Sequence, residues 1–332
     1  MKYDIEVDWQ LLDTCNYRCT YCFYDASRLG SKLPAFASSV AWRSAFDASS
    51  MVWLAHITGG EPSIYPDFVA LCQGLTANHY ISVNSNLTGP SLAEFADTID
   101  PSRVSFINAG FHPEERERRS GVDIFLRHAD RLRSAGFPIL VSVVATPAAL
   151  AQFDDAIELL AWAQLFPIPK LFRGMWNGDR YPHSYSAEDK GRFRHFSALA
   201  RDFYGGTLAR RAEPPSLDML HDDAFVDGLP DYTGSMCEAG HRFVRMMPSG
   251  DVFRCDRKNF LGNLLDGTFT RRLDSAPCDN RHCFYFCNKY TGRNAVVGVR
   301  KNDVKGHEQP ICGSRAMSAS HPIATEFRHR GK

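Results

Sequence analysis

Short apolar runs alternate with helical patterns over residues 1–205 of the chain. In Gly121–Ala135 the apolar side chains recur at helical spacing, and Gly136 follows as a C-cap. Thr146 before Pro147 predicts the start of the next helix, and Ser186 opens another with a capping-box pattern. The apolar runs predict six strands, Ile5–Leu12, Val52–Ile57, Tyr80–Ser85, Arg103–Ala109, Ile139–Ala145 and Lys170–Arg173.

Strands that alternate with helices predict a parallel sheet with right-handed crossovers. Six βα units close most of a barrel but fall short of the eight in a complete one. We therefore expect the α/β class, with a partial (β/α)6 TIM-like barrel in residues 1–205. The functional site of such a fold lies at the C-terminal ends of the strands.

After residue 205 the alternation stops. Residues 206–235 are charged and interrupted by proline, which predicts a linker. In residues 236–315, short strands, glycine turns and cysteines predict a small cysteine-rich α+β domain held by metal. Residues 316–332 are polar and basic and are predicted to be a flexible tail.

Charge and composition argue against three classes of protein: nucleic-acid-binding, membrane-spanning and secreted proteins. The 332 residues contain 38 Lys+Arg and 38 Asp+Glu, so no nucleic-acid partner is expected. The most apolar stretch, residues 138–151, is too short to span a bilayer, so no membrane partner is expected. The N-terminus has charges where a signal peptide needs an apolar run. We therefore predict a cytoplasmic protein, in which ten cysteines indicate metal or redox chemistry.

Three of these cysteines follow the first predicted strand directly, at Cys15, Cys19 and Cys22. Iron–sulfur clusters are bound by thiolates at such spacings. Structural zinc normally takes four ligands, so three thiolates leave one coordination position open for substrate chemistry. The alternative is three reduced core cysteines. Cys72 lies in an apolar helical pattern and is predicted to be a core residue.

This CxxxCxφC loop, in which φ is Tyr21, resembles the signature of the radical S-adenosylmethionine (SAM) enzymes. The resemblance implies that Cys15, Cys19 and Cys22 bind three irons of a [4Fe–4S] cluster, whose fourth iron is chelated by S-adenosyl-L-methionine. It implies reductive cleavage of SAM to a 5′-deoxyadenosyl radical, which abstracts hydrogen from substrate. It also implies a one-electron donor such as flavodoxin or ferredoxin.

The resemblance extends to Gly59-Gly60-Glu61-Pro62, which matches the family's GGEP motif after the second strand. A glycine pair lets backbone approach a ligand closely. The resemblance implies that the carboxylate of Glu61 accepts a hydrogen bond from the ammonium of SAM. Taken alone, the motif can also be an ordinary turn with a surface carboxylate.

Three further strand ends carry candidate ligands. Ser85 and Asn86 match the place of a Thr-Asn-Gly motif that contacts SAM in the family, although Leu87 replaces the glycine. His112, after the fourth strand, is a candidate contact to SAM or substrate, or else an ordinary surface or core histidine. Arg173, after the sixth strand, can bind a carboxylate bidentately, or form a salt bridge that closes the barrel.

A second cysteine group lies between residues 237 and 312. The spacing of Cys237, Gly250 and Cys255 resembles the entrance of a SPASM or twitch domain, in which a glycine turn brings two cysteines to an auxiliary [4Fe–4S] cluster. The later part departs from the family pattern, because Ser275 stands where a cysteine is expected. The remaining candidate metal ligands are Cys278, Cys283, Cys287 and Cys312.

Two iron–sulfur ligand sets stay open for this region. In one, Cys237 and Cys255 join two later cysteines around a single auxiliary cluster. In the other, two clusters have three cysteines each, and Asp274 or Ser275 supplies an oxygen ligand. A zinc site is the third interpretation. A spare cysteine would be inert or would donate a hydrogen atom to a substrate radical.

The resemblance implies an oxidoreductase or epimerase. We expect hydrogen abstraction from a small polar, sugar- or cyclitol-like substrate, giving dehydrogenation or epimerisation in natural-product biosynthesis. The alternative is radical SAM modification of a ribosomal peptide or protein side chain. A first strand that begins at residue 5 leaves no room for the leader-recognition domain that such enzymes often carry, which favours the small substrate. A non-catalytic, metal-stabilised binding module is an alternative of another class.

Overall fold

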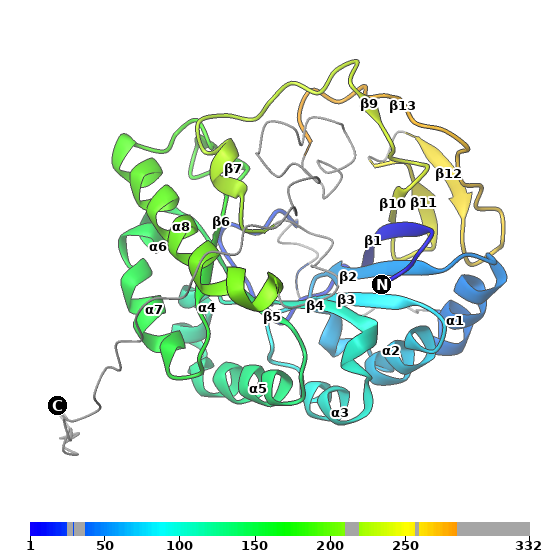
Figure 1. The fold of residues 1–332 in the computed structure, drawn as a ribbon, viewed down its shortest axis with the longest axis horizontal. Helices are drawn as coiled ribbons and strands as arrows, with labels where there is room; N and C mark the ends of the chain where they lie inside the picture. The colour runs from blue at the N-terminus through cyan, green and yellow to red at the C-terminus, as the bar shows by residue number, and fades with distance from the viewer. Residues whose placement is uncertain (25–28, 30–36, 210–218, 256–258, 284–332) are drawn as a thin grey trace, which may run out of the picture. The chain divides into compact units, whose positions relative to one another are not determined.

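The computed structural model contains a nine-stranded sheet in the order β12-β11-β10-β1-β2-β3-β4-β5-β6 (Figure 1). Its six consecutive parallel strands are β1 (Ile5–Leu12), β2 (Trp53–Gly59), β3 (Tyr80–Ser85), β4 (Val104–Gly110), β5 (Ile139–Val144) and β6 (Pro167–Lys170). These strands confirm the predicted α/β class and partial barrel. The structure describes residues 1–24, 29, 37–209, 219–255 and 259–283.

Helices connect these strands and lie outside them in Figure 1. They are α1 (Ser39–Ala48), α2 (Phe68–Thr76), α3 (Ser91–Thr98), α4 (Pro113–Arg118), α5 (Val122–Ser134), α6 (Pro147–Ala151), α7 (Phe153–Ala161) and α8 (Ala187–Ala209). Short 3-10 turns span Pro62–Ile64, Pro101–Arg103 and Asp222–Phe225. In the part of the chain that the structure describes, no helix has the length and apolarity needed to cross a membrane.

The predicted helix starts are confirmed by their capping bonds. The hydroxyl of Thr146 accepts a hydrogen bond from Ala149 N at 3.1 Å at the start of α6. At α8, Ser186 Oγ accepts from Asp189 N at 3.0 Å, and Asp189 Oδ2 accepts from Ser186 N at the same distance. These bonds satisfy backbone N–H groups that a helix N-terminus leaves without intrahelical partners.

The sheet has an apolar outer face and a polar inner face. On β1, Ile5, Val7 and Trp9 belong to the main core, and Trp9 meets Trp42 of α1 with ring centroids 4.7 Å apart. Because side chains alternate along a strand, Glu6 and its neighbours at Asp8 and Gln10 point to the inner face. There, Glu6 Oε2 lies 3.2 Å from His56 Nε2. The inner face is therefore built from buried polar contacts.

The last predicted strand was placed wrongly, whereas the first five agree with the structure within two residues at each end. The sixth strand is Pro167–Lys170, rather than Lys170–Arg173. Among the described strands it pairs only with β5, at the end of the sheet, through Val141 opposite Pro167 and Val143 opposite Pro169. A proline lacks the N–H that a central strand needs but is tolerated in an edge strand.

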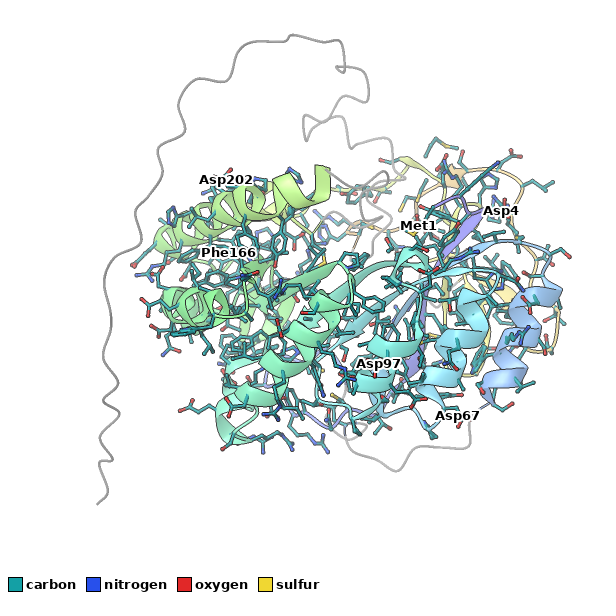
Figure 2. The ribbon with its side chains drawn as sticks, turned by 60° about the horizontal axis from the view of Figure 1, so that its bottom comes forward. Met1, Asp4, Asp67, Asp97, Phe166 and Asp202 are labelled. Atoms are coloured by element: carbon teal, nitrogen blue, oxygen red, sulfur yellow. The ribbon has the colours of Figure 1, made fainter. Side chains whose placement is uncertain are left out.

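Helix α8 packs against this edge strand. Phe166, labelled in Figure 2, precedes β6 and stacks on Phe203 of α8 with ring centroids 5.5 Å apart. The hydroxyl of Tyr204 donates to Phe166 O at 2.7 Å. The contact closes the exposed side of β6 with aromatic side chains.

The segment after residue 235 joins the same sheet, because β10 (Phe243–Met246) pairs in parallel with β1. β11 (Asp251–Phe253) and β12 (Phe260–Asn263) continue the sheet in antiparallel order. Two further pairs are separate: β9 (Met236–Cys237) with β13 (Ala276–Pro277), and β7 (Gly174–Trp176) with β8 (Asp179–Tyr181). The predicted linker 206–235 contains the end of α8 and the 3-10 turn Asp222–Phe225, and its residues 210–218 lie outside the described part. The predicted tail, residues 316–332, also lies outside it.

Candidate functional site

The loop with the first three cysteines begins at the C-terminal end of β1. Cys15, Cys19 and Cys22 are all half-buried and have free thiols. Tyr17 N donates to Cys15 Sγ at 3.3 Å, and Cys22 N donates to Cys19 O at 3.1 Å. These bonds fold the loop back on itself, so that the thiols share one end of the sheet, where a site was predicted.

The three thiols suit a cluster better than a single ion. Burial, with a smaller contribution from the nearby Cys15 and Cys22, raises the pKa of Cys19 to about 12. Bound iron stabilises the thiolate form that burial disfavours. Among the described residues, no three or more Cys, His, Asp or Glu side chains converge as they would around one metal ion. In an iron–sulfur cluster each thiolate binds a different iron, so such convergence is not needed.

The glycine pair after β2 packs against the cysteine loop. A Cβ at Gly60 would lie 1.9 Å from Thr14 O, and one at Gly59, whose φ is +131°, would lie 2.3 Å from Leu12 O. Gly60 N donates to Leu12 O at 2.8 Å, and Glu61 N donates to Thr14 O at 2.9 Å. The pair is predicted from sequence to admit a ligand. In the structure, the close approach that requires glycine is to the backbone at the start of the cysteine loop.

Glu61 is a buried carboxylate that joins the ends of β2 and β3. Its Oε1 accepts hydrogen bonds from Ser63 N at 3.0 Å, Ser63 Oγ at 2.5 Å and Ser85 Oγ at 2.7 Å. Its Oε2 accepts from Asn86 N at 2.6 Å. Burial raises the pKa of Glu61, and these donors oppose the rise. Pro62 begins the 3-10 turn that redirects the chain after this residue.

Asn86 links the end of β3 to the cysteine loop. Its Nδ2 donates to Asn16 Oδ1 at 2.9 Å, and Asn16 Nδ2 donates to Thr88 Oγ1 at 2.7 Å. Leu87 beside it is fully buried and has a φ of +55°. Glycine is favoured in that left-handed conformation. The chain therefore keeps the backbone of the Asn-Gly pattern, although the glycine is absent.

His112 contacts Tyr21, the aromatic residue of the cysteine motif. Its Nδ1 lies 2.8 Å from the Tyr21 hydroxyl, which also hydrogen-bonds the thiol of Cys19. Burial, followed by the nearby Arg116, lowers the pKa of His112 to about 3, so the ring is neutral at pH 7. The structure thus brings His112 to the cysteine loop.

Arg116 was missed from the sequence, because it stands in a charged run typical of a surface helix. It is fully buried on α4. Its Nη1 donates to the Tyr17 hydroxyl at 3.1 Å. Its Nη2 donates to Asn86 O at 2.6 Å and to Gly110 O at 2.9 Å. This side chain connects the cysteine loop with the ends of β3 and β4.

A polar ladder on the inner face was also missed. Asn108 Nδ2 donates to Asn84 Oδ1 at 2.7 Å, and Asn84 Nδ2 donates to Thr58 Oγ1 at 3.4 Å. Each of these residues lies near the C-terminal end of its strand. Polar residues in otherwise apolar strands were the sequence signal that could have indicated them.

Arg173 forms the salt bridge that was one of its two predicted roles. Its Nη2 lies 2.8 Å from Asp222 Oδ1, and its guanidinium lies 5.2 Å from the centre of the Phe225 ring. Its Nη1 donates to Cys283 O at 3.3 Å. The side chain therefore connects the end of the barrel with the second cysteine group.

In the second group, Cys237, Cys255 and Cys283 belong to one buried cluster with Tyr232, Ala239 and Phe243, and the half-buried Cys278 packs against it. Burial raises the pKa of Cys278, and Cys237 and Cys283 are close enough to add to the rise. Asp274 is exposed and Ser275 is half-buried. Cys287 and Cys312 lie outside the described residues.

A family model matches part of this chain. The model of the radical SAM superfamily matches residues 9–160. That range contains the cysteine loop, the glycine pair, Asn86 and Arg116. The match thus covers the residues that meet at the C-terminal ends of β1 to β4.

Several characterised proteins are similar over most of the chain. Mycofactocin maturase MftC of Mycobacterium tuberculosis is 30% identical over 276 residues, which cover 79% of this chain and 68% of that protein. MftC of Mycobacterium ulcerans is 27% identical over 286 residues, which cover 81% of this chain and 74% of that protein. GTP 3′,8-cyclase of Sinorhizobium medicae is 25% identical over 273 residues, which cover 76% of this chain and 75% of that protein.

Solved structures share the fold. Streptococcus suis SuiB bound to S-adenosylmethionine aligns with a TM-score of 0.53 and 14% identity, covering 80% of this chain and 64% of that chain. The protein anSMEcpe with bound AdoMet aligns with a TM-score of 0.51 and 17% identity, covering 80% and 79%.

Proposed function

The chain belongs to the radical SAM superfamily, and from that membership we propose that it modifies a peptide by hydrogen abstraction. Enzymes of this superfamily use a [4Fe–4S] cluster and S-adenosylmethionine. We assign the cluster to Cys15, Cys19 and Cys22, whose loop begins at the end of β1. When both cofactors are bound, one external electron gives the 5′-deoxyadenosyl radical that takes hydrogen from the substrate.

The carboxylate of Glu61 is the proposed partner of the SAM ammonium. Each oxygen of a carboxylate has about two acceptor positions, and Oε2 of Glu61 accepts one hydrogen bond, from Asn86 N. It therefore has capacity for one further donor. Burial strengthens such a bond, because water competes weakly with the ligand.

Neighbouring residues position the cofactor loop. Gly60 packs on its backbone, and Asn86 bonds Asn16, which follows the first cysteine. Tyr21 and His112 bond each other on the other side of the loop. These contacts fix the loop before any ligand binds, which lowers the ordering cost of binding.

A peptide substrate has the support of the comparisons. Relatives that are 30% identical are named maturases, and fold neighbours were solved with peptides, SuiB with its precursor peptide SuiA and anSMEcpe with the Kp18Cys peptide. The relative named for a small molecule, GTP 3′,8-cyclase, is less similar at 25% identity, so the comparisons favour a peptide over the sugar- or cyclitol-like substrate that the sequence led us to expect.

We also assign one auxiliary [4Fe–4S] cluster to Cys237, Cys255, Cys278 and Cys283. Their common packing supports the single-cluster set over two clusters with three cysteines each. We propose residues 236–315 as a SPASM- or twitch-like domain around this cluster, with 206–235 as its linker to the barrel.

The test is an assay without oxygen. The reconstituted enzyme receives SAM, a one-electron reductant and synthetic peptides encoded by short reading frames beside its gene. We expect 5′-deoxyadenosine together with a mass change in one peptide, and neither product from Cys19→Ala. Cleavage of SAM with every peptide unchanged and a sugar or cyclitol altered instead would reject the peptide substrate but keep the radical chemistry.

A further inference from the structure

Two cationic side chains are buried in the described part of the chain, and each lies beside one cysteine group. Arg116 is 0% exposed and Arg254 is 5% exposed, and no other described arginine or lysine is fully buried. By surface exposure, the remaining described arginines and lysines are half-buried or exposed. Lys170 differs from the others, because burial lowers its pKa, and the nearby carboxylates of Asp222 and Asp8 oppose that shift. These two therefore need a reason for being buried.

Among the described residues, Arg116 is hydrogen-bonded only to neutral oxygens. Its guanidinium donates to the Tyr17 hydroxyl and to the carbonyls of Asn86, Gly110 and Gly121, at 2.6 to 3.2 Å. Its Nε has no hydrogen-bond partner within the described part of the chain. Glu61 is near enough to interact electrostatically but has its hydrogen bonds with serines and with Asn86 N.

Arg254 repeats this arrangement at the second cysteine group. Its Nε donates to Ala239 O at 3.1 Å, its Nη1 to Pro277 O at 2.9 Å and its Nη2 to Ala276 O at 2.8 Å. Ala239 N bonds Cys237 Sγ at 3.5 Å, and Pro277 precedes Cys278 directly. One guanidinium thus holds the three segments that carry Cys237, Cys255 and Cys278.

A buried cation without a carboxylate partner is costly, because carbonyl dipoles offset only part of the lost hydration. A cluster held by thiolates supplies the missing negative charge, and reduction adds one more. Nearby charge and hydrogen bonding set the potential of such clusters. A fixed cation beside each cluster therefore favours its reduced form.

We propose that Arg116 and Arg254 are the counter-charges of the two clusters, one for each, and that each raises the reduction potential of its own cluster. The inference rests on the proposed function, since it requires clusters at both cysteine groups. Both arginines are positioning residues, because they act on the clusters through charge and through the loops that hold them.

The experiment is a potentiometric titration of the reconstituted enzyme, followed by electron paramagnetic resonance. The two clusters are assigned with a Cys15, Cys19 and Cys22→Ala background, which keeps only the auxiliary signal. We expect Arg116→Met to lower the ratio of reduced to oxidised SAM-binding cluster at least tenfold at a fixed potential, which is 59 mV for one electron. Arg254→Met should lower the same ratio at least tenfold for the auxiliary cluster and leave the SAM-binding cluster unchanged.

Conservative variants separate charge from structure. Arg116→Lys and Arg254→Lys keep the charge but lose the planar set of guanidinium donors. In these variants the ratio of reduced to oxidised cluster at a fixed potential should stay within threefold of the wild-type ratio. Arg116→Gln and Arg254→Gln lose the charge, and should lower the reduction potential of the neighbouring cluster as much as the Met variants do. If a Met variant takes up no iron, this Lys and Gln pair carries the test.

Exposed arginines serve as matched controls. Arg118 lies on the same helix as Arg116 and pairs with Glu115, and Arg242 pairs with Glu238 near Arg254. Arg118→Met and Arg242→Met should leave both potentials unchanged. The inference would be overturned if the Lys, Gln and Met variants of one arginine had the same reduction potential. It would also be overturned if replacing one arginine shifted the reduction potentials of both clusters. Iron-free wild-type protein would reject the cluster assignment itself, and this inference with it.

Discussion

Glu61 and Arg116 hold opposite ends of one residue, Asn86. The carboxylate accepts the Asn86 N–H at 2.6 Å, and the guanidinium donates to the Asn86 carbonyl at 2.6 Å. Charged groups at both ends of this residue fix its side chain where it bonds Asn16 in the cysteine loop. The ends of β2, β3 and β4 and the cofactor loop are thus joined through Asn86.

Replacing Glu61 tests its role toward SAM. Glu61→Gln removes the charge from the proposed acceptor of the SAM ammonium, and hydrogen bonds to charged groups contribute about 1.5–3 kcal/mol. We expect SAM affinity to fall roughly ten- to hundredfold, measured by equilibrium dialysis on the reconstituted enzyme. Glu94→Gln, on the exposed side of α3, is the control. Unchanged affinity in Glu61→Gln would remove Glu61 from the SAM site.

The two cysteine groups should separate by iron content and by activity. Cys15→Ala, Cys19→Ala or Cys22→Ala should abolish SAM cleavage and leave the iron of the second group in place. Cys255→Ala should lower iron content and peptide turnover while some SAM cleavage continues. Cys72→Ala is the control, because Cys72 is fully buried in α2, as predicted, and away from both groups. Full SAM cleavage by any variant of the first group would contradict its assignment.

A methyl group at residue 60 should displace the cysteine loop. In Gly60→Ala the new Cβ would lie 1.9 Å from Thr14 O, so the backbone must move. We expect loss of iron from the first group, measured by iron analysis and absorbance, while circular dichroism shows a folded barrel. Gly191→Ala is the matched control, since beyond the local backbone of α8 a Cβ there would meet no described atom within 4 Å. Alanine also stabilises a helix by about 1 kcal/mol relative to glycine.

At Leu87 a glycine substitution should leave the protein more stable than an alanine substitution, which reverses their usual order of stability. Both Leu87→Ala and Leu87→Gly lose a buried side chain, at about 2–5 kcal/mol for a leucine. The φ of +55° costs a residue with a Cβ about 1–2 kcal/mol, and glycine avoids that cost. We therefore expect the glycine variant to be the more stable by about 1 kcal/mol in urea denaturation.

At Leu160, buried inside α7, the same pair should show the opposite order, because glycine is the poorer helix former. An alanine variant more stable than the glycine variant at residue 87 would show that the left-handed conformation there is not strained.

Periodicity was enough to predict the elements that carry the site. The predicted Ile5–Leu12 and Tyr80–Ser85 coincide with β1 and β3, because their apolar residues alternate toward the helices. The loop with Cys15 then falls at the predicted edge, because parallel strands share a C-terminal edge.

Other features depend on tertiary contacts that a local pattern does not contain. Nothing in the run from Glu114 to Arg119 distinguishes Arg116, which is buried only because the ends of β3 and β4 surround it. The glycine pair was read as space for a ligand, because the neighbouring backbone of Thr14 is not visible in sequence. The sixth strand was displaced because its prolines are acceptable only at an edge.

The pairing of β10 with β1 has a consequence for the order of folding. β1 is synthesised before both of its neighbours, and one of them, Phe243–Met246, is made more than two hundred residues later. Contacts so distant in sequence form slowly, because a long loop must close first. Until then, one edge of the strand that leads into the cofactor loop is unpaired and open to aggregation. We therefore expect the first group to hold iron stably only after β10 has paired with β1.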